Sequence, residues 1–282
     1  MIFKYDMHTH SSHSDGEATV FEMGREAFEK GLLIFGCSDH AYTEHPDGSH
    51  GFGIRGEELD AYINDVYTLQ NMYQGKMDVL CGLEMENLEG FRHIDEFQDS
   101  QLNYLIGSTH TVSKDGIWYE VDHSEELFRK AGETLYGGDY YELVKDYYEL
   151  ESHVVENTRC DIIGHFDLVT KFNEGNKYFD ESSPKYLLYA LSCLEKLVKA
   201  DIPFEINPGA IARGHRTSPY PSDILLKELH SMGGRVILDS DAHDPLFIAY
   251  RFEEDLQLIK NCGFTKVSVI GARGEAELDL DA

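Results

Sequence analysis

The chain has 282 residues, with 24 Lys and Arg against 52 Asp and Glu, so its formal charge is −28. Such acidity argues against a protein that grips nucleic-acid backbones or an anionic membrane surface, because both kinds of binding require basic patches. Hydrophobic residues make up 41% of the chain, which is enough for a large packed core and excludes intrinsic disorder.

Short apolar runs alternate along the chain with longer segments of helical periodicity. Most runs lack polar alternation, as expected for parallel strands that are buried on both faces. They span residues 2–5, 32–37, 79–83, 104–107, 161–164, 202–206, 235–238 and, more weakly, 266–270. Because no linker or repeat interrupts them, we predict one elaborated α/β barrel domain over residues 1–282.

The segments between these runs contain signals for helix ends and for two insertions. Thr19 followed by Glu22 predicts a capping box, and the glycines at 233 and 234 end a helix that begins near Ser222. Residues 41–55 and 112–158 are too long for simple connections, so we expect loop insertions there, the second with a tyrosine-rich helix near 140–156.

The N-terminal residues and the cysteines predict a cytoplasmic protein. No apolar stretch of signal-peptide or membrane-span length is present. The five cysteines are odd in number and lack CxxC spacing, so a disulfide framework or a zinc ribbon is not expected. Cys37, Cys81 and Cys160 lie in apolar runs and are expected to be buried, reduced thiols.

Six of the 14 histidines stand just after a strand-like run, and Glu84 and Asp241 share that placement. Asp15 lies a few residues beyond His8 and His10. In an α/β barrel the carboxyl ends of all strands meet at one rim, where catalytic groups gather. A lone histidine at a strand end is usually structural, but six are not expected to reach the same rim by accident. The predicted metal ligands are His8, His10, Asp15, His40, Glu84, His110, His165, Asp241 and His243.

This donor set indicates the kind of metal and the number of ions. Imidazole with carboxylate suits Zn, Mn or Fe better than Ca or Mg, which prefer shells made only of oxygen. A single catalytic zinc takes about three or four protein ligands, so nine donors imply two or three adjacent ions. The positive charge of these ions would let an anionic phosphate bind inside an acidic protein.

The motifs around these ligands resemble those of the PHP (polymerase and histidinol phosphatase) family of metal-dependent phosphoesterases. The matching motifs run in family order across nearly the whole chain. They are His8-Thr9-His10, Ser14-Asp15-Gly16, Ser38-Asp39-His40, Gly82-Leu83-Glu84, Ser108-Thr109-His110, Gly164-His165-Phe166-Asp167 and Ser240-Asp241-Ala242-His243. The resemblance implies a distorted (β/α)7 TIM-like barrel and hydrolysis of a phosphate ester.

The resemblance also implies how the ligands divide among three ions. The first site would use His8, His10, Glu84 and Asp241. Glu84 would bridge to a second site with His110 and His165. The third site would use Asp15, His40 and His243.

Within the family, the length and the segment EINPGAIARGHRTSPYPS resemble histidinol-phosphate phosphatases, as does HFDLVTKF. We therefore expect hydrolysis of L-histidinol phosphate, a small metabolite of histidine biosynthesis, with no nucleic-acid or membrane partner. Many histidinol phosphatases carry histidine where this chain has Asp15. The oligomeric state is left open.

Several residues beyond the ligands are candidates for contact with the substrate. Arg213, Arg216 and Lys171 follow strand ends on the same rim, and arginine suits bidentate contact with phosphate. We assign Arg213, Glu84 and Asp241 to catalysis. We expect substitution of Arg213 by alanine to leave the metal content unchanged. His45 and Asp39 are candidate proton donors to the leaving group, and His215 is a further site candidate. For the cationic end of the substrate the candidates are Glu44, Asp47, Glu120 and Asp122.

Three other functions remain open at this point. The chain could be another PHP phosphoesterase, either a phosphotyrosine phosphatase or a nuclease-like enzyme, although its charge disfavours nucleic acid. An amidohydrolase barrel also begins with an HxH motif but typically needs a bridging lysine, whereas the bridge candidate here is Glu84. An inactive metal-binding module is the alternative outside enzymes.

Overall fold

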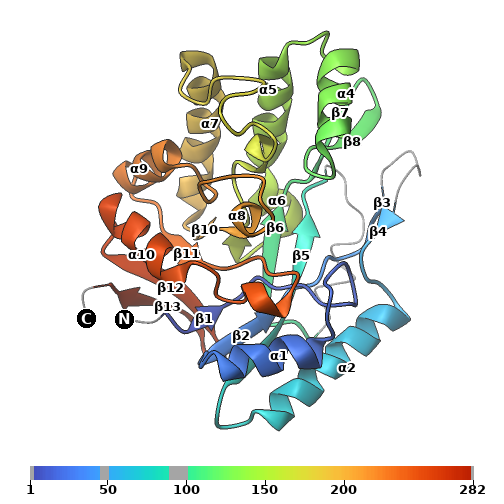
Figure 1. Cartoon of the computed structure of the whole chain (residues 1–282), viewed down its shortest axis with the longest axis vertical. Helices are drawn as coiled ribbons and strands as arrows, with labels where there is room; N and C mark the ends of the chain where they lie inside the picture. Colours follow the sequence, from blue (N-terminus) through green and yellow to red (C-terminus); the bar gives the residue numbers. More distant parts are fainter. Residues whose placement is uncertain (1–2, 45–50, 89–100, 281–282) are drawn as a thin grey trace.

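The computed structural model describes residues 3–44, 51–88 and 101–280. Its central sheet has the strand order β1-β2-β5-β6-β9-β10-β11-β12-β13, and every neighbouring pair up to β12 is parallel (Figure 1). The parallel strands are β1 Tyr5–Asp6, β2 Ile34–Cys37, β5 Asp78–Glu86, β6 Tyr104–Ser108, β9 Ile162–Ile163, β10 Phe204–Ile206, β11 Val236–Leu238 and β12 Lys266–Gly271. Each of them falls on or beside one of the predicted apolar runs.

Residues that follow β1 and β11 close this series into a barrel. Thr9 and Ala242 form a parallel bridge, in which His10 N donates to Ala242 O at 2.9 Å and Ala242 N donates to His8 O at 3.3 Å. Seven parallel strands, β1 to β11 in sheet order, therefore surround one interior. The predicted distorted (β/α)7 barrel is confirmed. The weak run near 266–270 is β12, which continues the sheet outside the closing pair and is followed by the antiparallel strand β13, Gly274–Asp279.

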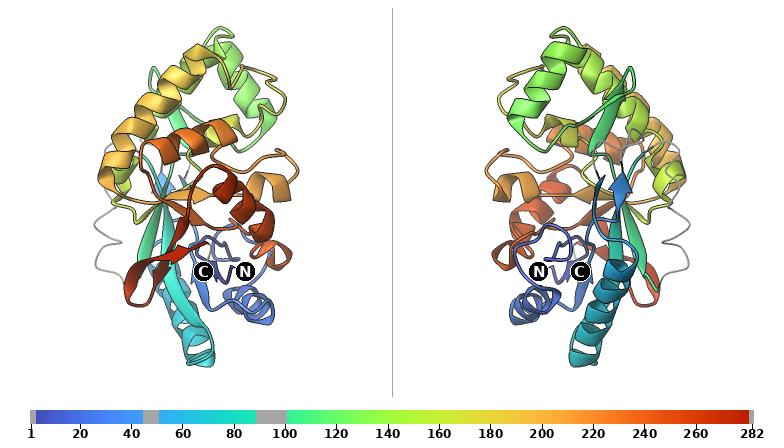
Figure 2. Two further views of the ribbon diagram at one scale, coloured as in Figure 1. Left: turned by 90° about the vertical axis from the view of Figure 1, so that its left-hand side faces the viewer. Right: turned by 90° about the vertical axis from the view of Figure 1, so that its right-hand side faces the viewer.

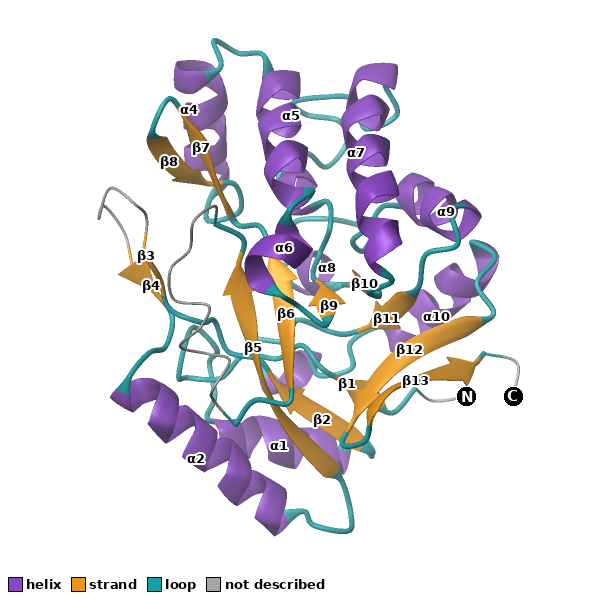
Figure 3. Cartoon of the chain, turned by 180° about the vertical axis from the view of Figure 1, so that it is seen from behind, coloured by secondary structure: helices purple, strands orange, loops and turns teal. Residues whose placement is uncertain are grey.

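Helices cover the outside of the sheet, as Figure 3 shows. Figure 2 shows α1 and α2 at one end of the long axis and α4, α5 and α7 at the other. The helices are α1 Val20–Glu29, α2 Glu57–Met72, α4 Glu125–Leu135, α5 Tyr140–Glu151, α6 Val154–Thr158, α7 Pro184–Leu197, α8 Gly209–Ala212, α9 Asp223–Ser231 and α10 Phe252–Asn261. Thr19 and Glu22 form the predicted capping box on α1. The expected helix at 140–156 is two helices, because the chain breaks at Ser152 and His153 between α5 and α6.

An apolar cluster joins residues of β5, β6, β9 and β11 to Met7, just after β1, and to Ile270 on β12. Its members are all at most 6% exposed, namely Met7, Leu80, Tyr104, Ile106, Ile162, Ile237 and Ile270. The Tyr104 side chain reaches across the interior, and a Cβ atom at Gly36 or Gly82 would overlap it. These two glycines therefore make room for the ring, whose hydroxyl donates to the carbonyl of Met7 just before the first predicted ligand.

The two predicted insertions contain short antiparallel hairpins. In the first, β3 Thr43–Glu44 pairs with β4 Gly51–Phe52, and in the second, β7 Thr111–Lys114 pairs with β8 Ile117–Glu120. Both hairpins follow strand ends on the side of the barrel that carries the predicted ligands. The predicted burial of Cys37, Cys81 and Cys160 as free thiols is confirmed, and the other two cysteines are buried and free as well. Among the described residues, no helix combines the length and the apolar character needed to cross a membrane. The assignment of residues 1–282 to a single domain stays a prediction.

Candidate metal centre

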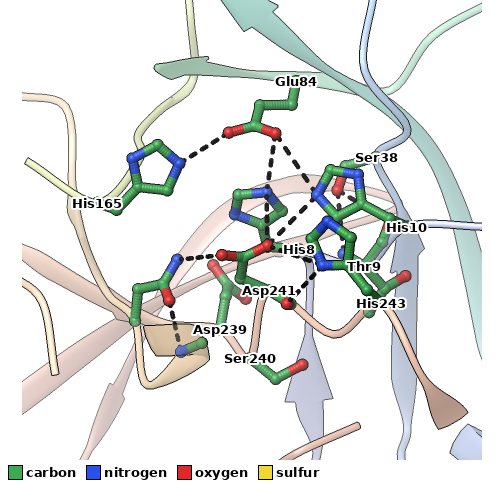
Figure 4. A network of polar contacts seen from close by, with 12 residues as sticks. His8, Thr9, His10, Ser38, Glu84, His165, Asp239, Ser240, Asp241 and His243 are labelled. Atoms are coloured by element: carbon green, nitrogen blue, oxygen red, sulfur yellow. Dashed lines mark hydrogen bonds and ion pairs between the residues drawn. The ribbon is translucent and has the colours of Figure 1, made fainter. Parts of the chain in front are cut away.

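The predicted ligands converge at the carboxyl ends of the barrel strands, and six of the seven strands supply them. Figure 4 shows His8, His10, Glu84, His165, Asp241 and His243 turned toward one another. His40 follows β2, His110 follows β6, and Asp15 comes from the loop after β1. The rim geometry of a parallel barrel therefore brings together residues that lie far apart in the sequence.

Glu84 lies at the centre of this cluster and is 1% exposed. Its Oε1 lies 2.9 Å from Nε2 of His165 and 3.4 Å from Nε2 of His110. Its Oε2 faces three further ring nitrogens, at 3.1 Å for His40 Nδ1, 3.4 Å for His8 Nε2 and 3.5 Å for His10 Nε2. Each carboxylate oxygen thus faces a different group of histidines, which is the arrangement expected of a bridging ligand.

Asp15 and Asp241 face the remaining histidines. Asp15 Oδ2 lies 3.2 Å from Nε2 of His243, and Asp15 Oδ1 lies 3.6 Å from Nδ1 of His10 and 3.7 Å from Nε2 of His40. Asp241 Oδ1 lies 3.4 Å from Nε2 of His10 and 3.5 Å from Nδ1 of His243. Every predicted ligand therefore has at least one other predicted ligand within 4 Å.

Among the described residues, three groups of donor atoms lie within 4.8 Å of one another: His8, His10 and Glu84; His40, Glu84 and His110; and His10, Asp15, His40 and His243. These groups overlap the predicted three sites but do not match them. Asp241 and His165 fall in none of the groups, and His10 and His40 each belong to one group beyond their predicted site. The division of ligands among ions therefore stays a prediction.

Unpartnered buried atoms show that the cluster fits metal ions. His8 Nε2, both ring nitrogens of His10, and Glu84 Oε2 are buried without a hydrogen-bond partner in the described part of the chain. Buried polar atoms are normally satisfied, so atoms that converge without partners indicate a place for a cation. Imidazole and carboxylate together form the donor set that Zn, Mn and Fe accept.

The electrostatics keep the carboxylates of the cluster anionic. Burial alone would raise the pKa of Glu84, but His40, His8 and His110 lower that pKa well below its ordinary value. Burial would also raise the pKa of Asp241, but the positive charges of Arg213 and His8 outweigh burial and lower this pKa well below its ordinary value.

Burial lowers the pKa of His40 to about 3. Burial acts in the same direction on His8 and His110, but Glu205 and Glu84 raise the pKa of His8, and Glu84 and Glu86 raise the pKa of His110. Because metal ions bind the neutral imidazole and the ionised carboxylate, metal binding would displace protons from these two rings.

Two glutamates that the sequence reasoning missed contact the predicted ligands. Glu86 Oε2 lies 2.7 Å from Nδ1 of His110, and its Oε1 accepts the backbone N–H groups of His110 and Thr111. Glu205 Oε1 lies 2.5 Å from Nδ1 of His8. A signal existed for both, because Glu86 alternates with Glu84 on β5 and Glu205 is a charged residue inside an apolar strand.

Arg213 reaches the cluster, whereas Arg216 does not. The Arg213 guanidinium donates to Asp241 Oδ2 at 2.8 Å and lies 3.2 Å from Nδ1 of His243. Arg216 is 7% exposed and donates to both carboxylate oxygens of Glu181 and to the carbonyl of Thr170. The expectation that Arg216 contacts the phosphate is therefore corrected, because its guanidinium is occupied by a buried ion pair.

A cavity of about 370 Å³ opens beside the cluster, a size within the range of small-molecule sites. It is lined by Asp15, His40, Ala41, Thr43, Phe52, Glu84, Glu86, His110, Thr111, Glu120, Asp122, His123 and Lys171. Lys171 Nζ lies 3.2 Å from Asp122 Oδ2 in its wall. The β7–β8 hairpin and the residues after it thus supply acidic groups to the cavity, and the segment after β9 supplies one lysine.

The other predicted site residues divide into three cases. His45 and Asp47 lie outside the described residues. Asp39 is fully buried and accepts hydrogen bonds from Ser11 and Ser14, so it holds the loop before Asp15. Glu44 is exposed on β3 and does not line the cavity.

His215 packs edge-on against Phe172, with the ring centroids 5.4 Å apart. Burial, with the positive charges of Lys171 and Arg213, lowers the pKa of His215. The histidine therefore lies near two candidate phosphate contacts, but it does not line the cavity.

Curated relatives match this chain along most of their own length. A protein from Schizosaccharomyces pombe named "probable histidinol-phosphatase" is 26% identical over 93% of this chain and 88% of its own length. The histidinol-phosphatase of Bacillus subtilis is 24% identical over 90% of this chain and 98% of its own length.

A solved structure shares the fold. It is the histidinol phosphate phosphatase of Lactococcus lactis complexed with zinc, L-histidinol and phosphate. The two structures align with a TM-score of 0.70 at 21% identity, over 97% of this chain and 98% of that chain.

The family model of the PHP domain matches residues 6–209, which include β1 to β10 and all but two of the predicted ligands. Asp241 and His243 come after the matched segment, yet they complete the same cluster of side chains. The chain belongs to the PHP domain family.

Proposed function

We propose that the chain is a metal-dependent phosphomonoester hydrolase that converts L-histidinol phosphate and water into L-histidinol and phosphate. The observation that carries the proposal is the convergence of nine imidazole and carboxylate ligands beside a cavity that also contains Lys171. Relatives that match over nearly the whole chain are named histidinol-phosphatases, which supports this substrate among phosphomonoesters.

The ligand cluster would hold two or three divalent transition-metal ions of Zn, Mn or Fe. His8, His10, Glu84 and Asp241 would hold the first ion, and Glu84, His110 and His165 the second. Asp15, His40 and His243 would hold the third. When bound, such ions make water nucleophilic at neutral pH and stabilise the charge that develops on phosphate oxygens.

Two cations of the chain are candidates to orient the phosphate. Arg213 stands over Asp241 with part of its guanidinium toward His243, where it can donate to a phosphate oxygen. Lys171 lies in the cavity wall, where it can contact a phosphate in the cavity. The buried position of Asp39 argues against it as the proton donor to the leaving oxygen.

The acidic wall of the cavity suits the cationic end of the substrate. Histidinol phosphate carries an ammonium and an imidazole next to its phosphate. Asp122 and Glu120 line the cavity at the end of the β7–β8 hairpin. Because carboxylates bind cations and repel further anions, we assign these two residues to the ammonium or imidazole group.

A phosphatase panel tests this function. We expect the metal-loaded protein to hydrolyse L-histidinol phosphate with a kcat/KM at least about 10-fold higher than para-nitrophenyl phosphate or a phosphotyrosyl peptide. Equal or faster turnover of the peptide would assign the protein to the phosphotyrosine phosphatase branch of the family. Full metal content without turnover of any phosphoester would support an inactive metal-binding module.

A cytoplasmic location belongs to the same proposal. It is supported by the five free, buried cysteines and by the biosynthetic role that the relatives' name implies.

A further inference from the structure

The strand β10 is the one barrel strand that supplies no predicted metal ligand, and the side chains at its carboxyl end contact the ligands of its neighbours. We propose that Glu205, on β10, is a positioning residue that fixes the ring of His8 and the start of the His165 loop so that both face the metal ions. This inference rests on the metal site of the proposed function.

Glu205 has three donors and is fully buried. Its Oε1 lies 2.5 Å from Nδ1 of His8. Its Oε2 accepts the backbone N–H of His165 at 2.8 Å and the side-chain N–H of Asn207 at 2.9 Å. One carboxylate therefore connects ligands that follow β1 and β9, which are on different sides of the predicted metal cluster.

Asn207 extends this contact to a third strand end. Its Nδ2 also lies 3.3 Å from Asp241 Oδ2, while its Oδ1 accepts the N–H of Gly209 at 2.8 Å. Its backbone is paired with Tyr220 in both directions, which holds the residue in place. Glu205 is thus connected to His8, His165 and, through Asn207, to Asp241.

The chemistry of a carboxylate sets the orientation of His8. An ionised carboxylate only accepts hydrogen bonds, so a ring nitrogen that bonds to it must carry the hydrogen. Nδ1 of His8 then donates to Glu205, and the lone pair of Nε2 is left to face Glu84 at 3.4 Å and Asp241 at 3.8 Å. Carboxylate partners of ligating histidines fix the tautomer in this way in metal sites generally.

Glutamine cannot replace Glu205 in this role. Its amide has one accepting oxygen and one donating NH₂ group, whereas the site presents donors to both carboxylate oxygens. If the NH₂ group faced His8, Nδ1 would have to accept and Nε2 would carry the hydrogen that blocks a metal. If the NH₂ group faced His165 and Asn207 instead, it would meet the N–H donors of both residues, and no acceptor would remain for them. Aspartate retains the accepting chemistry on a shorter side chain.

The test compares Glu205→Gln, Glu205→Asp and a matched control. Asp255→Asn is the control, because Asp255 is a carboxylate only 1% exposed on α10 that contacts Arg251 and no predicted ligand. Zn²⁺ affinity is measured by competition with a chelator. Proton NMR of the Zn²⁺-loaded, ¹⁵N-histidine-labelled wild type tests for a low-field Nδ1 proton on His8, assigned by its loss in His8→Asn.

We expect Glu205→Gln to raise the Kd for Zn²⁺ at least about 10-fold, the effect typical of removing a partner of a metal ligand, and to remove the low-field proton. Glu205→Asp should keep the proton and bind Zn²⁺ with intermediate affinity, and Asp255→Asn should bind as the wild type does.

Two results would overturn the proposal. One is a folded Glu205→Gln variant with wild-type Zn²⁺ affinity, which would leave Glu205 a purely structural role. The other is a wild-type spectrum without a low-field Nδ1 proton on His8, which needs no variant and so decides the question even if Glu205→Gln fails to fold. Both readouts are independent of turnover, so a failure of the proposed substrate would leave them interpretable.

Discussion

Arg213 and Asp241 form an ion pair at 2.8 Å on the edge of the metal-ligand cluster, and the same guanidinium also donates to the backbone carbonyl of Asp241. The arginine that we assign to the phosphate is therefore also the partner of a predicted metal ligand. This double contact revises the expectation that Arg213 acts on the phosphate alone.

The first prediction concerns Arg213. Arg213→Ala should lower kcat/KM for phosphomonoesters at least about 10-fold, because one charge-assisted contact with the phosphate is lost. It should also weaken metal binding, since Asp241 loses the partner that holds its carboxylate. Steady-state kinetics and metal analysis measure the two effects, and Arg216→Lys, at a buried arginine outside the cavity, is the control for metal content. Unchanged kinetics and metal content would contradict both assigned roles of Arg213.

The second prediction concerns the central carboxylate. Glu84→Gln should remove metal and activity together, because its two oxygens face different groups of histidines and share one negative charge between them. The joint loss is measured by metal analysis after dialysis and by kcat of the same protein samples. Glu44→Gln, an exposed glutamate on β3, should leave both unchanged. A Glu84→Gln protein that keeps full metal and more than a tenth of the wild-type kcat contradicts the bridging assignment.

The third prediction concerns the substrate's cationic end. Asp122→Asn should lower kcat/KM for L-histidinol phosphate at least about 10-fold but that for para-nitrophenyl phosphate by less than about 3-fold, because only the first substrate carries an ammonium. Asp115→Asn, in the turn of the same hairpin, is the control. Equal losses on the two substrates would show that Asp122 acts through its ion pair with Lys171 rather than on the substrate's cation.

The fourth prediction concerns the pH dependence of stability. Burial raises the pKa of Asp255 to about 6, although Arg251 acts in the opposite direction. Because the folded state favours the protonated acid, the stability contributed by this group is present at low pH and is lost as pH rises through about 6. Between pH 5 and pH 8 the wild type should lose about 1 kcal/mol of unfolding free energy relative to Asp255→Asn. Urea denaturation in chelator measures this difference, and a difference that does not change with pH would contradict the shift.

The ligand cluster could be predicted because strand ends in a parallel barrel share one rim. Histidines directly after apolar runs, such as His40 and His165, are therefore placed together by topology alone. Glu205 lies inside a run that predicts only a buried strand, so its contact with His8 does not follow from the pattern. A charged residue within an apolar strand is nevertheless a signal of a buried polar contact.

The roles of Arg213 and Arg216 could not be separated from the sequence. The two are three residues apart after the same strand, and each guanidinium is placed by a partner distant in the chain. Asp241 is the partner of Arg213, and Glu181 is the partner of Arg216. The break between α5 and α6 likewise has no glycine or proline to announce it.

The bridge between Thr9 and Ala242 joins positions that are separated by most of the chain. Ligands stand on both sides of this seam, with His8 and His10 after β1 and Asp241 and His243 after β11. An ion bound between them would act as a cross-link between these distant segments, which limits the chain entropy gained when the seam opens. Hydrogen exchange at the backbone amides of His10 and Ala242 should therefore respond to chelation before exchange in the rest of the barrel.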